Sequence, residues 1–256
     1  MYNKNRLEYL SWPVIEQKIK QGYETVIICT ASVEQHGHHL PEFTDSRIGS
    51  ELCDIIADKL ENVLIAPIIT IGRSEHHLAM PGTVSLRPEI YQGVIEDYVS
   101  CYKNSGFKNI ILIASHGGNI GPNLAIVEEL RVMHPDLNII CPITMEKLMG
   151  VMQEMSEEYQ FGEGASGHAG AFETAVMLHL TPDLLYMDEA KPGFTEPMTL
   201  EVVEKLFTEG MKGLSEVGIL GDPTVGVTAE MGKKYIHHTA NVLVDAIKAE
   251  FAAKKG

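Results

Sequence analysis

Short apolar runs that alternate with amphipathic segments constrain the fold of this chain more than any other feature of its sequence. Residues 25–31 (TVIICTA) are β-branched and apolar on both faces, which predicts a strand buried within a parallel sheet. Residues 45–60 follow with apolar side chains at helical spacing. Further strands are predicted at 63–71, 109–114 and 137–142, and further helices at 87–106, 122–133, 173–180, 200–214 and 239–253. This alternation predicts a parallel sheet that is covered by helices on both faces.

The composition is typical of an acidic protein with one domain. No linker or low-complexity tract interrupts the sequence, so we expect a single domain over residues 1–256. Asp and Glu outnumber Lys and Arg by 35 to 20, and the formal charge of -15 disfavours binding to nucleic acid or to a membrane. The four cysteines form no CxxC pair and the N-terminus lacks the apolar core of a secretory signal, which predicts a cytoplasmic protein with reduced thiols.

Residues that can hold a metal or move a proton follow the predicted strands directly. They lie in the segment after the first strand, in the loop after the third strand and in a glycine-rich loop further along the chain. Six of them stand out: Glu34, His36, Asp45, His116, His168 and Glu173. Because ligands of open parallel sheets bind where loops leave the carboxyl ends of the strands, we expect these side chains to form one site.

Carboxylates and imidazoles together make a nitrogen and oxygen ligand set that suits zinc, manganese or iron. Five such ligands with one bridging carboxylate predict two divalent metal ions, roughly 3.5–4 Å apart. Each residue taken singly has another interpretation. Asp45 could cap the following helix, and Glu173 could complement a helix dipole. The gathering of ligand residues after several strands favours the metal site.

Four blocks of the sequence resemble the signature of the creatininase (creatinine amidohydrolase) family. They are Glu34-Gln35-His36-Gly37 with Leu40-Pro41 and Thr44-Asp45, His77 with Pro81-Gly82-Thr83, His116-Gly117-Gly118-Asn119, and His168-Ala169-Gly170 followed by Glu173-Thr174. The resemblance implies a three-layer α/β/α fold with a mostly parallel central sheet, a dinuclear metal centre and assembly into a homohexamer. It implies a metal-dependent amidohydrolase that acts on carbon–nitrogen bonds other than ordinary peptide bonds.

The same resemblance implies a role for each residue of the predicted site. Glu34 and His116 would hold one metal, His36 and Glu173 the other, and Asp45 would bridge the two. His168 would lie beside the metals as a proton shuttle or substrate contact, so that His168 and Glu173 are the predicted catalytic residues.

Three further residues are candidates for binding the substrate. Arg73 could bind a substrate carboxylate or phosphate, or could form a structural ion pair with Glu75. The resemblance favours His77 over the adjacent His76. Asn119 could hydrogen-bond a ligand carboxylate or the substrate. The pair His237-His238 is expected at the start of the last helix, with a surface or interface role.

Two departures from the family pattern bear on the substrate. Gly118 stands where creatinine-hydrolysing members have a glutamate, so we expect Glu173 to supply that carboxylate. Those members also close tryptophans over the creatinine ring, whereas Trp12 is the one tryptophan here and residues 145–160 are methionine-rich. We therefore expect a small cyclic amide, formamide or cyclic ketone rather than creatinine.

Several alternatives remain at this stage. Within the family, the chain could be an inosose (cyclic keto-inositol) hydrolase, a formamide deformylase or an enzyme that trims a modified peptide. Outside it, the chain could be a metal-binding module without turnover, or a metal-free hydrolase with Ser74 or Ser115 as nucleophile, although no G-x-S-x-G motif surrounds either serine.

Overall fold

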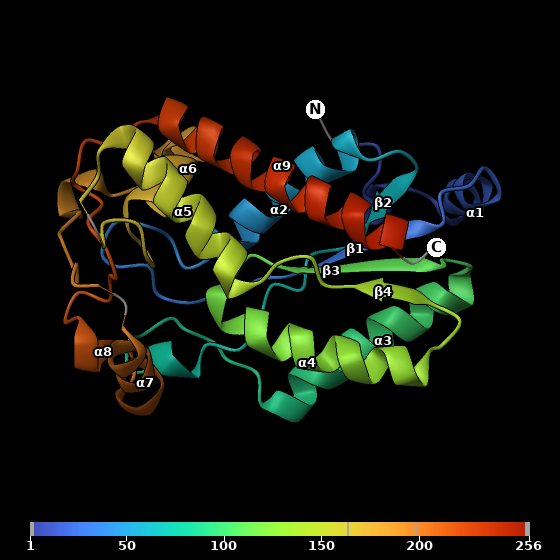
Figure 1. The fold of residues 1–256 in the computed structure, drawn as a ribbon, viewed down its shortest axis with the longest axis horizontal. Coiled ribbons are helices and arrows are strands. Elements are labelled where there is room, and N and C mark those ends of the chain that lie inside the picture. Colours follow the sequence, from blue (N-terminus) through green and yellow to red (C-terminus); the bar gives the residue numbers. More distant parts are fainter. Residues whose placement is uncertain (1–2, 163, 198, 254–256) are drawn as a thin grey trace.

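The computed structural model describes residues 3–162, 164–197 and 199–253. A sheet of four parallel strands in the order β2-β1-β3-β4 lies at its centre (Figure 1). The strands are β1 (Thr25–Thr30), β2 (Val63–Ile65), β3 (Asn109–Ala114) and β4 (Asn138–Ile140). The interior residues of β1 and β3 are buried on both faces, as continuous apolar runs in a covered parallel sheet should be.

Helices cover both faces of this sheet. The α-helices are α1 (Trp12–Lys20), α2 (Thr44–Lys59), α3 (Pro88–Ser105), α4 (Gly117–Met133), α5 (Met145–Tyr159), α6 (Ala171–Leu180), α7 (Leu200–Glu209), α8 (Met211–Leu214) and α9 (Ala229–Ala253), and the short 3-10 helices are η1 (Leu7–Tyr9), η2 (Glu75–His77), η3 (Pro182–Leu184) and η4 (Met187–Glu189). In Figure 1, α2, α6 and α9 lie on one face of the sheet, and α3 and α4 on the other. The predicted three-layer α/β/α fold is therefore confirmed. Among the described helices, none is long and apolar enough to cross a membrane.

Several predicted elements have different bounds in the structure. The strand predicted at 63–71 ends at Ile65, and only an isolated bridge between Thr30 and Ile69 continues the pairing. The helix predicted at 200–214 breaks at Gly210, whose φ of 78° lies in the left-handed region that interrupts a helix. The short N-terminal helix α1 was not predicted.

Two helices begin earlier than predicted. Helix α4 starts at Gly117 instead of residue 122, and so includes two glycines that could have formed a separate turn. Helix α9 starts at Ala229 instead of residue 239. The prediction that His237 and His238 lie at the start of the last helix is therefore wrong. They lie within it, because contacts with the rest of the protein stabilise an amphipathic helix beyond its local sequence signals.

Close packing of α6 against α9 holds the first turn of α6 in place. The rings of Phe172 and Tyr235 stack with centroids 4.5 Å apart and an angle of 6° between their planes. At Gly232 the two helices approach so closely that a Cβ atom would lie 1.9 Å from the carbonyl oxygen of Ala175. A glycine at this position is therefore a packing requirement.

We predict that Gly232→Ala lowers the free energy of unfolding by about 1–3 kcal/mol, because the added methyl group forces the two helices apart. Thermal unfolding measures the effect, which should be a fall of several degrees in Tm. Gly150→Ala in α5 is the matched control, since a Cβ at Gly150 would meet no atom within 4 Å. That control should leave Tm unchanged or raise it, because alanine favours a helix over glycine. Equal Tm values for the two variants would contradict the close approach.

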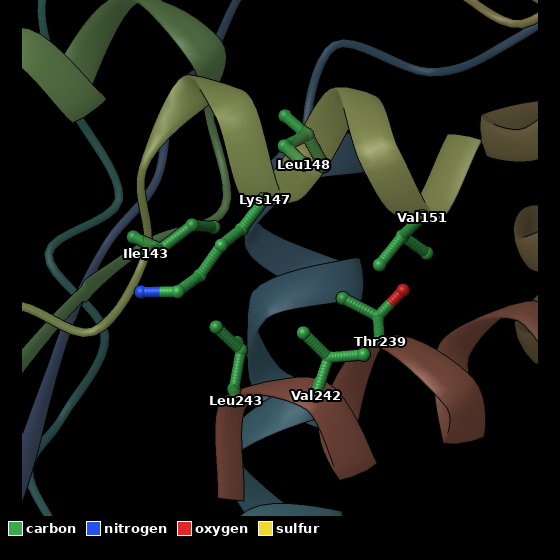
Figure 2. Close-up of a pocket in the computed structure, with 7 residues that line it drawn as sticks. All are labelled: Ile143, Lys147, Leu148, Val151, Thr239, Val242 and Leu243. Atoms are coloured by element: carbon green, nitrogen blue, oxygen red, sulfur yellow. The ribbon is translucent and has the colours of Figure 1, made fainter. Parts of the chain in front are cut away.

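Two hollows of very different size lie away from the predicted site. A cavity of about 10 Å³ lies between α5 and α9 (Figure 2) and has room for about one water molecule. It is lined by Ile143, Lys147, Leu148, Val151, Thr239, Val242 and Leu243. A groove of about 850 Å³ lies where the strands begin, beside Thr25, Val63 and Asn109. Neither hollow is lined by any of the predicted site residues, which follow the carboxyl ends of the strands.

Candidate metal centre

The six predicted residues meet at the carboxyl ends of β1 and β3. The segment after β1 supplies Glu34 and His36, and the residue after Ser115 at the end of β3 is His116. Asp45 and Glu173 lie in the first turns of α2 and α6, where a helix dipole stabilises negative charge. These elements bring residues up to 139 positions apart into one cluster.

Two groups of three ligand atoms share one carboxylate. In the first group, His116 Nδ1 lies 3.1 Å from Glu34 Oε1 and 3.3 Å from Asp45 Oδ2. In the second group, His36 Nε2 lies 3.4 Å from Asp45 Oδ1 and 3.6 Å from Glu173 Oε2. Each group could hold a metal ion, and Asp45 belongs to both. A third possible group combines Glu34, His36 and His168.

Four polar atoms of this cluster make no hydrogen bond to any of the described residues. Glu34 and His36 are 0% exposed and Asp45 is 1% exposed. Both carboxylate oxygens of Glu34, Nε2 of His36 and Oδ2 of Asp45 are buried without a hydrogen bond. Burial of unpaired polar atoms is costly, and buried charges are usually paired or bind metal. A pair of divalent cations would satisfy these atoms, so the residues present fit a metal centre.

Hydrogen bonds to main-chain carbonyls orient the two imidazoles. His36 donates from Nδ1 to the carbonyl oxygen of Glu34 at 2.9 Å, and His116 donates from Nε2 to the carbonyl oxygen of Arg73 at 2.9 Å. The other ring nitrogen of each histidine therefore faces the carboxylates, where it can bind a metal ion once its proton has left. This arrangement is usual for histidines that bind metals.

The electrostatics of the cluster favour cations. Although burial opposes charge on His36, the carboxylates of Asp45 and Glu173 raise the pKa of its imidazole to about 10. Glu34 and Asp45 likewise raise the pKa of His116 well above its usual value, against the effect of burial. Burial raises the pKa of Glu173 to about 7, although the neighbouring His36 opposes this shift. Protons occupy these positions when no metal does, and metal binding must release them.

His168 lies at the edge of the cluster and is partly open to solvent. Its Nδ1 lies 3.5 Å from Glu34 Oε1, and its side chain is 13% exposed. Burial, together with the neighbouring His36 and His77, lowers the pKa of His168 well below its usual value. The imidazole is therefore neutral near pH 7 and can accept a proton.

The three predicted substrate-binding residues have different surroundings. His77 is buried, and its Nε2 lies 3.4 Å from Glu34 Oε1. The guanidinium of Arg73 forms an ion pair with Glu75, which was the structural alternative for this residue. Asn119 accepts a hydrogen bond from the main-chain N–H of Arg73 at 2.9 Å and donates one to the carbonyl of Ala31 at 3.0 Å. The amide of Asn119 thus supports two loops around the cluster and contacts no carboxylate ligand.

The structure explains why position 118 carries no side chain. A Cβ atom at Gly118 would lie 2.4 Å from His116 Nε2 and 2.6 Å from the carbonyl oxygen of Arg73. It would also lie 3.0 Å from Cε1 of His76, whose ring stacks on that of His116 at 5.8 Å between centroids. A carboxylate on the chain at position 118 would require this loop to move.

Gln35 is a site residue that the sequence analysis missed. It is 4% exposed and forms hydrogen bonds or close contacts with His77, His168 and Gly218. The available signal was its position between two predicted ligands. A buried glutamine next to such ligands has to find hydrogen-bond partners of its own.

The chain is similar to known proteins over most of its length. Residues 8–247 match the family named creatininase, with the description creatinine amidohydrolase. The chain is 30% identical over 229 residues to a mycofactocin precursor peptide peptidase of Mycolicibacterium smegmatis, and the alignment covers 87% of this chain and 84% of that protein. It is 24% identical over 257 residues to a creatinine amidohydrolase of Pseudomonas putida, with coverage of 94% and 95%.

The chain is also similar to a third relative and to a solved structure. The chain is 25% identical over 185 residues to a 3-dehydro-scyllo-inosose hydrolase of Thermotoga maritima, with coverage of 72% of this chain and 58% of that protein. A crystal structure of creatinine amidohydrolase (creatininase) superimposes with a TM-score of 0.77 at 23% identity, covering 98% of this chain and 99% of that chain. The structural likeness confirms the fold.

Proposed function

The chain belongs to the creatininase family of amidohydrolases, and from this premise we propose that the buried cluster is a dinuclear metal centre that hydrolyses a carbon–nitrogen bond in a small molecule. One observation carries the proposal. Asp45 joins two groups of ligand atoms, and buried atoms in both groups lack hydrogen-bond partners. A bridging carboxylate between two divalent cations accounts for both features.

The proposed ligands follow the two groups. Glu34 and His116 would hold one ion, His36 and Glu173 would hold the other, and Asp45, which belongs to both groups, would be shared between them. Glu173 takes the place of the carboxylate that Gly118 cannot carry, and its main-chain contact supports this role. Glu173 Oε2 accepts a hydrogen bond from the N–H of Ala169 at 2.6 Å, which holds the carboxylate near His36.

In the proposed mechanism, the metal ions and the protein side chains have different roles. Bound zinc, manganese or iron ions would act as Lewis acids on the scissile carbonyl and lower the pKa of water. His168 would accept the proton of the attacking water and deliver it to the departing nitrogen of an amide, or to the departing carbon of a cyclic ketone. The partial exposure of His168 and Glu173, at 13% and 25% of their side chains, indicates that the substrate approaches from their side.

The proposed substrate is a small cyclic amide, formamide or cyclic ketone. Creatinine is disfavoured because Trp12 is 76% exposed on α1, which precedes β1 and so lies at the opposite end of the sheet from the cluster. Inosose hydrolysis and formamide removal are the alternatives within this class, and the similarity to an inosose hydrolase supports testing the former.

A peptide amide is the second candidate substrate. The relative with 30% identity is named as a peptidase of a precursor peptide, whereas identity to the creatinine amidohydrolase is 24%. Hydrolysis at the end of a modified peptide would use the same metals and the same proton transfer. Short peptides therefore belong beside formamides, cyclic amides and inososes in the substrate panel.

We also propose the assembly that the family resemblance implies and the location that the cysteine pattern predicts. The protein would be a single domain over residues 1–256 that forms a homohexamer in the cytoplasm. Large exposed apolar side chains support association, among them Trp12 at 76%, Val132 at 82% and Leu200 at 89% exposure. The buried cysteines Cys29 and Cys53 are free thiols, as expected in a reducing compartment.

Metal removal provides the direct test. We predict that a chelator abolishes hydrolysis of any responsive substrate in the panel, and that added zinc, manganese or iron restores it. Elemental analysis should find two ions per chain. Metal at a thousandfold excess over its Kd should also stabilise the fold by about 4 kcal/mol, measured as a rise in Tm.

Other outcomes would select one of the alternatives. A chain that binds metal but hydrolyses no member of the panel would be a binding module. Activity that is indifferent to the chelator would favour a serine nucleophile, and would contradict the proposal.

A further inference from the structure

We propose that Gln35 is a positioning residue that sets which ring nitrogen carries the proton in His77 and in His168. This inference rests on the proposed metal centre, because it concerns residues that orient a ligand and move a proton. Gln35 itself is buried and stands between the proposed ligands Glu34 and His36. The hydrogen bonds of Gln35 determine which ring nitrogen carries the proton in each of these histidines.

The orientation of the Gln35 amide follows from two main-chain partners. Its Oε1 accepts a hydrogen bond from the N–H of Gly37 at 3.0 Å, and its Nε2 donates to the carbonyl of Gly218 at 2.9 Å. The reversed amide would place an NH2 group against an N–H group and an oxygen against a carbonyl. Gln35 therefore presents a donor, and not an acceptor, to its remaining neighbours.

This donor defines the proton position in His77. Gln35 Nε2 lies 2.8 Å from His77 Nδ1, so Nδ1 must be the unprotonated acceptor. The single proton of the neutral ring is then on Nε2, which lies 3.4 Å from Glu34 Oε1. The protonated Nε2 of His77 accordingly faces the carboxylate of the proposed ligand Glu34, although it makes no hydrogen bond to it in this structure, and it supports that carboxylate instead of contacting the substrate as the sequence led us to expect.

The main chain of Gln35 defines the proton position in His168. His168 Nε2 lies 2.8 Å from the carbonyl oxygen of Gln35, which can only accept, so Nε2 carries the proton. The Gln35 amide nitrogen is also 3.1 Å from this N–H, but both of its hydrogens already serve Gly218 and His77. His168 Nδ1 is left with a free lone pair that faces the cluster, as proton transfer from water requires.

Gly218, which is far from Gln35 in the sequence, leaves space for the side-chain amide of Gln35 because it has no Cβ atom. Its φ of +73° favours glycine, and a Cβ atom there would lie 2.1 Å from Gln35 Oε1. The three atoms nearest to such a Cβ all belong to the Gln35 amide, so a side chain at position 218 would displace that amide. The position therefore offers a second variant that tests the same contact.

The experiment compares zinc-loaded wild-type protein with Gln35→Glu, using ¹⁵N-labelled histidine. Solid-state NMR of the sedimented protein distinguishes a proton on Nδ1 from a proton on Nε2 whatever the size of the assembly, with His77→Asn and His168→Asn assigning the signals. In wild type, both His77 and His168 should carry the proton on Nε2. In Gln35→Glu, the new carboxylate accepts a hydrogen bond from His77, whereas the amide NH2 group of Gln35 donates one to it. His77 should therefore carry its proton on Nδ1, while His168 keeps its hydrogen bond to the main-chain carbonyl of residue 35.

Zinc affinity provides the second measurement. It should fall about 10–100-fold in Gln35→Glu, the usual effect of losing a partner that orients a metal ligand. Gln35→Met and Gly218→Ala should weaken zinc binding in the same direction, and they serve if Gln35→Glu does not fold. Gln153→Glu is the matched control, since Gln153 is exposed on α5, and it should change neither measurement.

Two results would overturn the inference. One is a wild-type His77 or His168 with its proton on Nδ1. The other is a folded Gln35→Glu whose His77 signals and zinc affinity equal those of wild type. A wild-type chain that binds no zinc would instead refute the proposed function, while the proton positions in wild type would still test the role of Gln35.

Discussion

Replacing Asp45 with asparagine is expected to remove bound metal and to lower turnover by more than roughly 100-fold, a larger effect than the loss of an outer partner of a ligand. Asp45 is the one residue that belongs to both groups of ligand atoms, with Oδ1 3.4 Å from His36 Nε2 and Oδ2 3.3 Å from His116 Nδ1. The asparagine side chain keeps the volume but loses the negative charge, and its amide nitrogen cannot bind a cation. Elemental analysis and turnover on the substrate panel measure the outcome.

A comparison within the same helix separates metal loss from misfolding. Asp58→Asn removes the same charge from an exposed position of α2 and should retain metal and activity. The Tm of metal-free Asp45→Asn should lie below that of metal-free wild type, because the substitution removes the carboxylate that pairs with His36 and His116, but the variant should still unfold in a single cooperative transition. Two ions per chain in Asp45→Asn, with full turnover, would refute the dinuclear centre.

The second large effect is expected at His168. We predict that His168→Asn lowers kcat by roughly 10²–10⁴-fold, the range for loss of a general acid or base, while both metal ions remain bound. Its Nδ1 faces the cluster at 3.5 Å from Glu34, and its pKa is held well below the usual value by burial and by the neighbouring His36 and His77. Steady-state kinetics and metal content measured on the same preparation provide the test.

The metal content decides how a loss of activity is interpreted. His168 also belongs to a possible third group of ligand atoms with Glu34 and His36. Loss of an ion in His168→Asn would show that His168 is a ligand, and would contradict its role as a proton carrier. His237→Asn, at an exposed position on α9, is the control and should change neither quantity.

Much of the fold could be predicted because the relevant signals are local. The continuous apolar runs that became β1 and β3 needed burial on both faces, and the intervening amphipathic segments supplied the covering helices. Element bounds were less accurate where tertiary contacts decide them. Helix α9 begins ten residues before its prediction because it packs along α6, and Gly210 divides the helix predicted at 200–214.

The sequence by itself determined that the candidate metal ligands follow the strands, since chain order places them there and parallel strands end at one edge of the sheet. Only the tertiary structure decided which atoms meet. It pairs Arg73 with Glu75, turns the Asn119 amide to the main chain and joins Gln35 to His77 and Gly218. The physical reason is that side-chain periodicity is set by near neighbours along the chain. The choice of a hydrogen-bond partner depends instead on how distant segments pack, as the 183 residues between Gln35 and Gly218 illustrate.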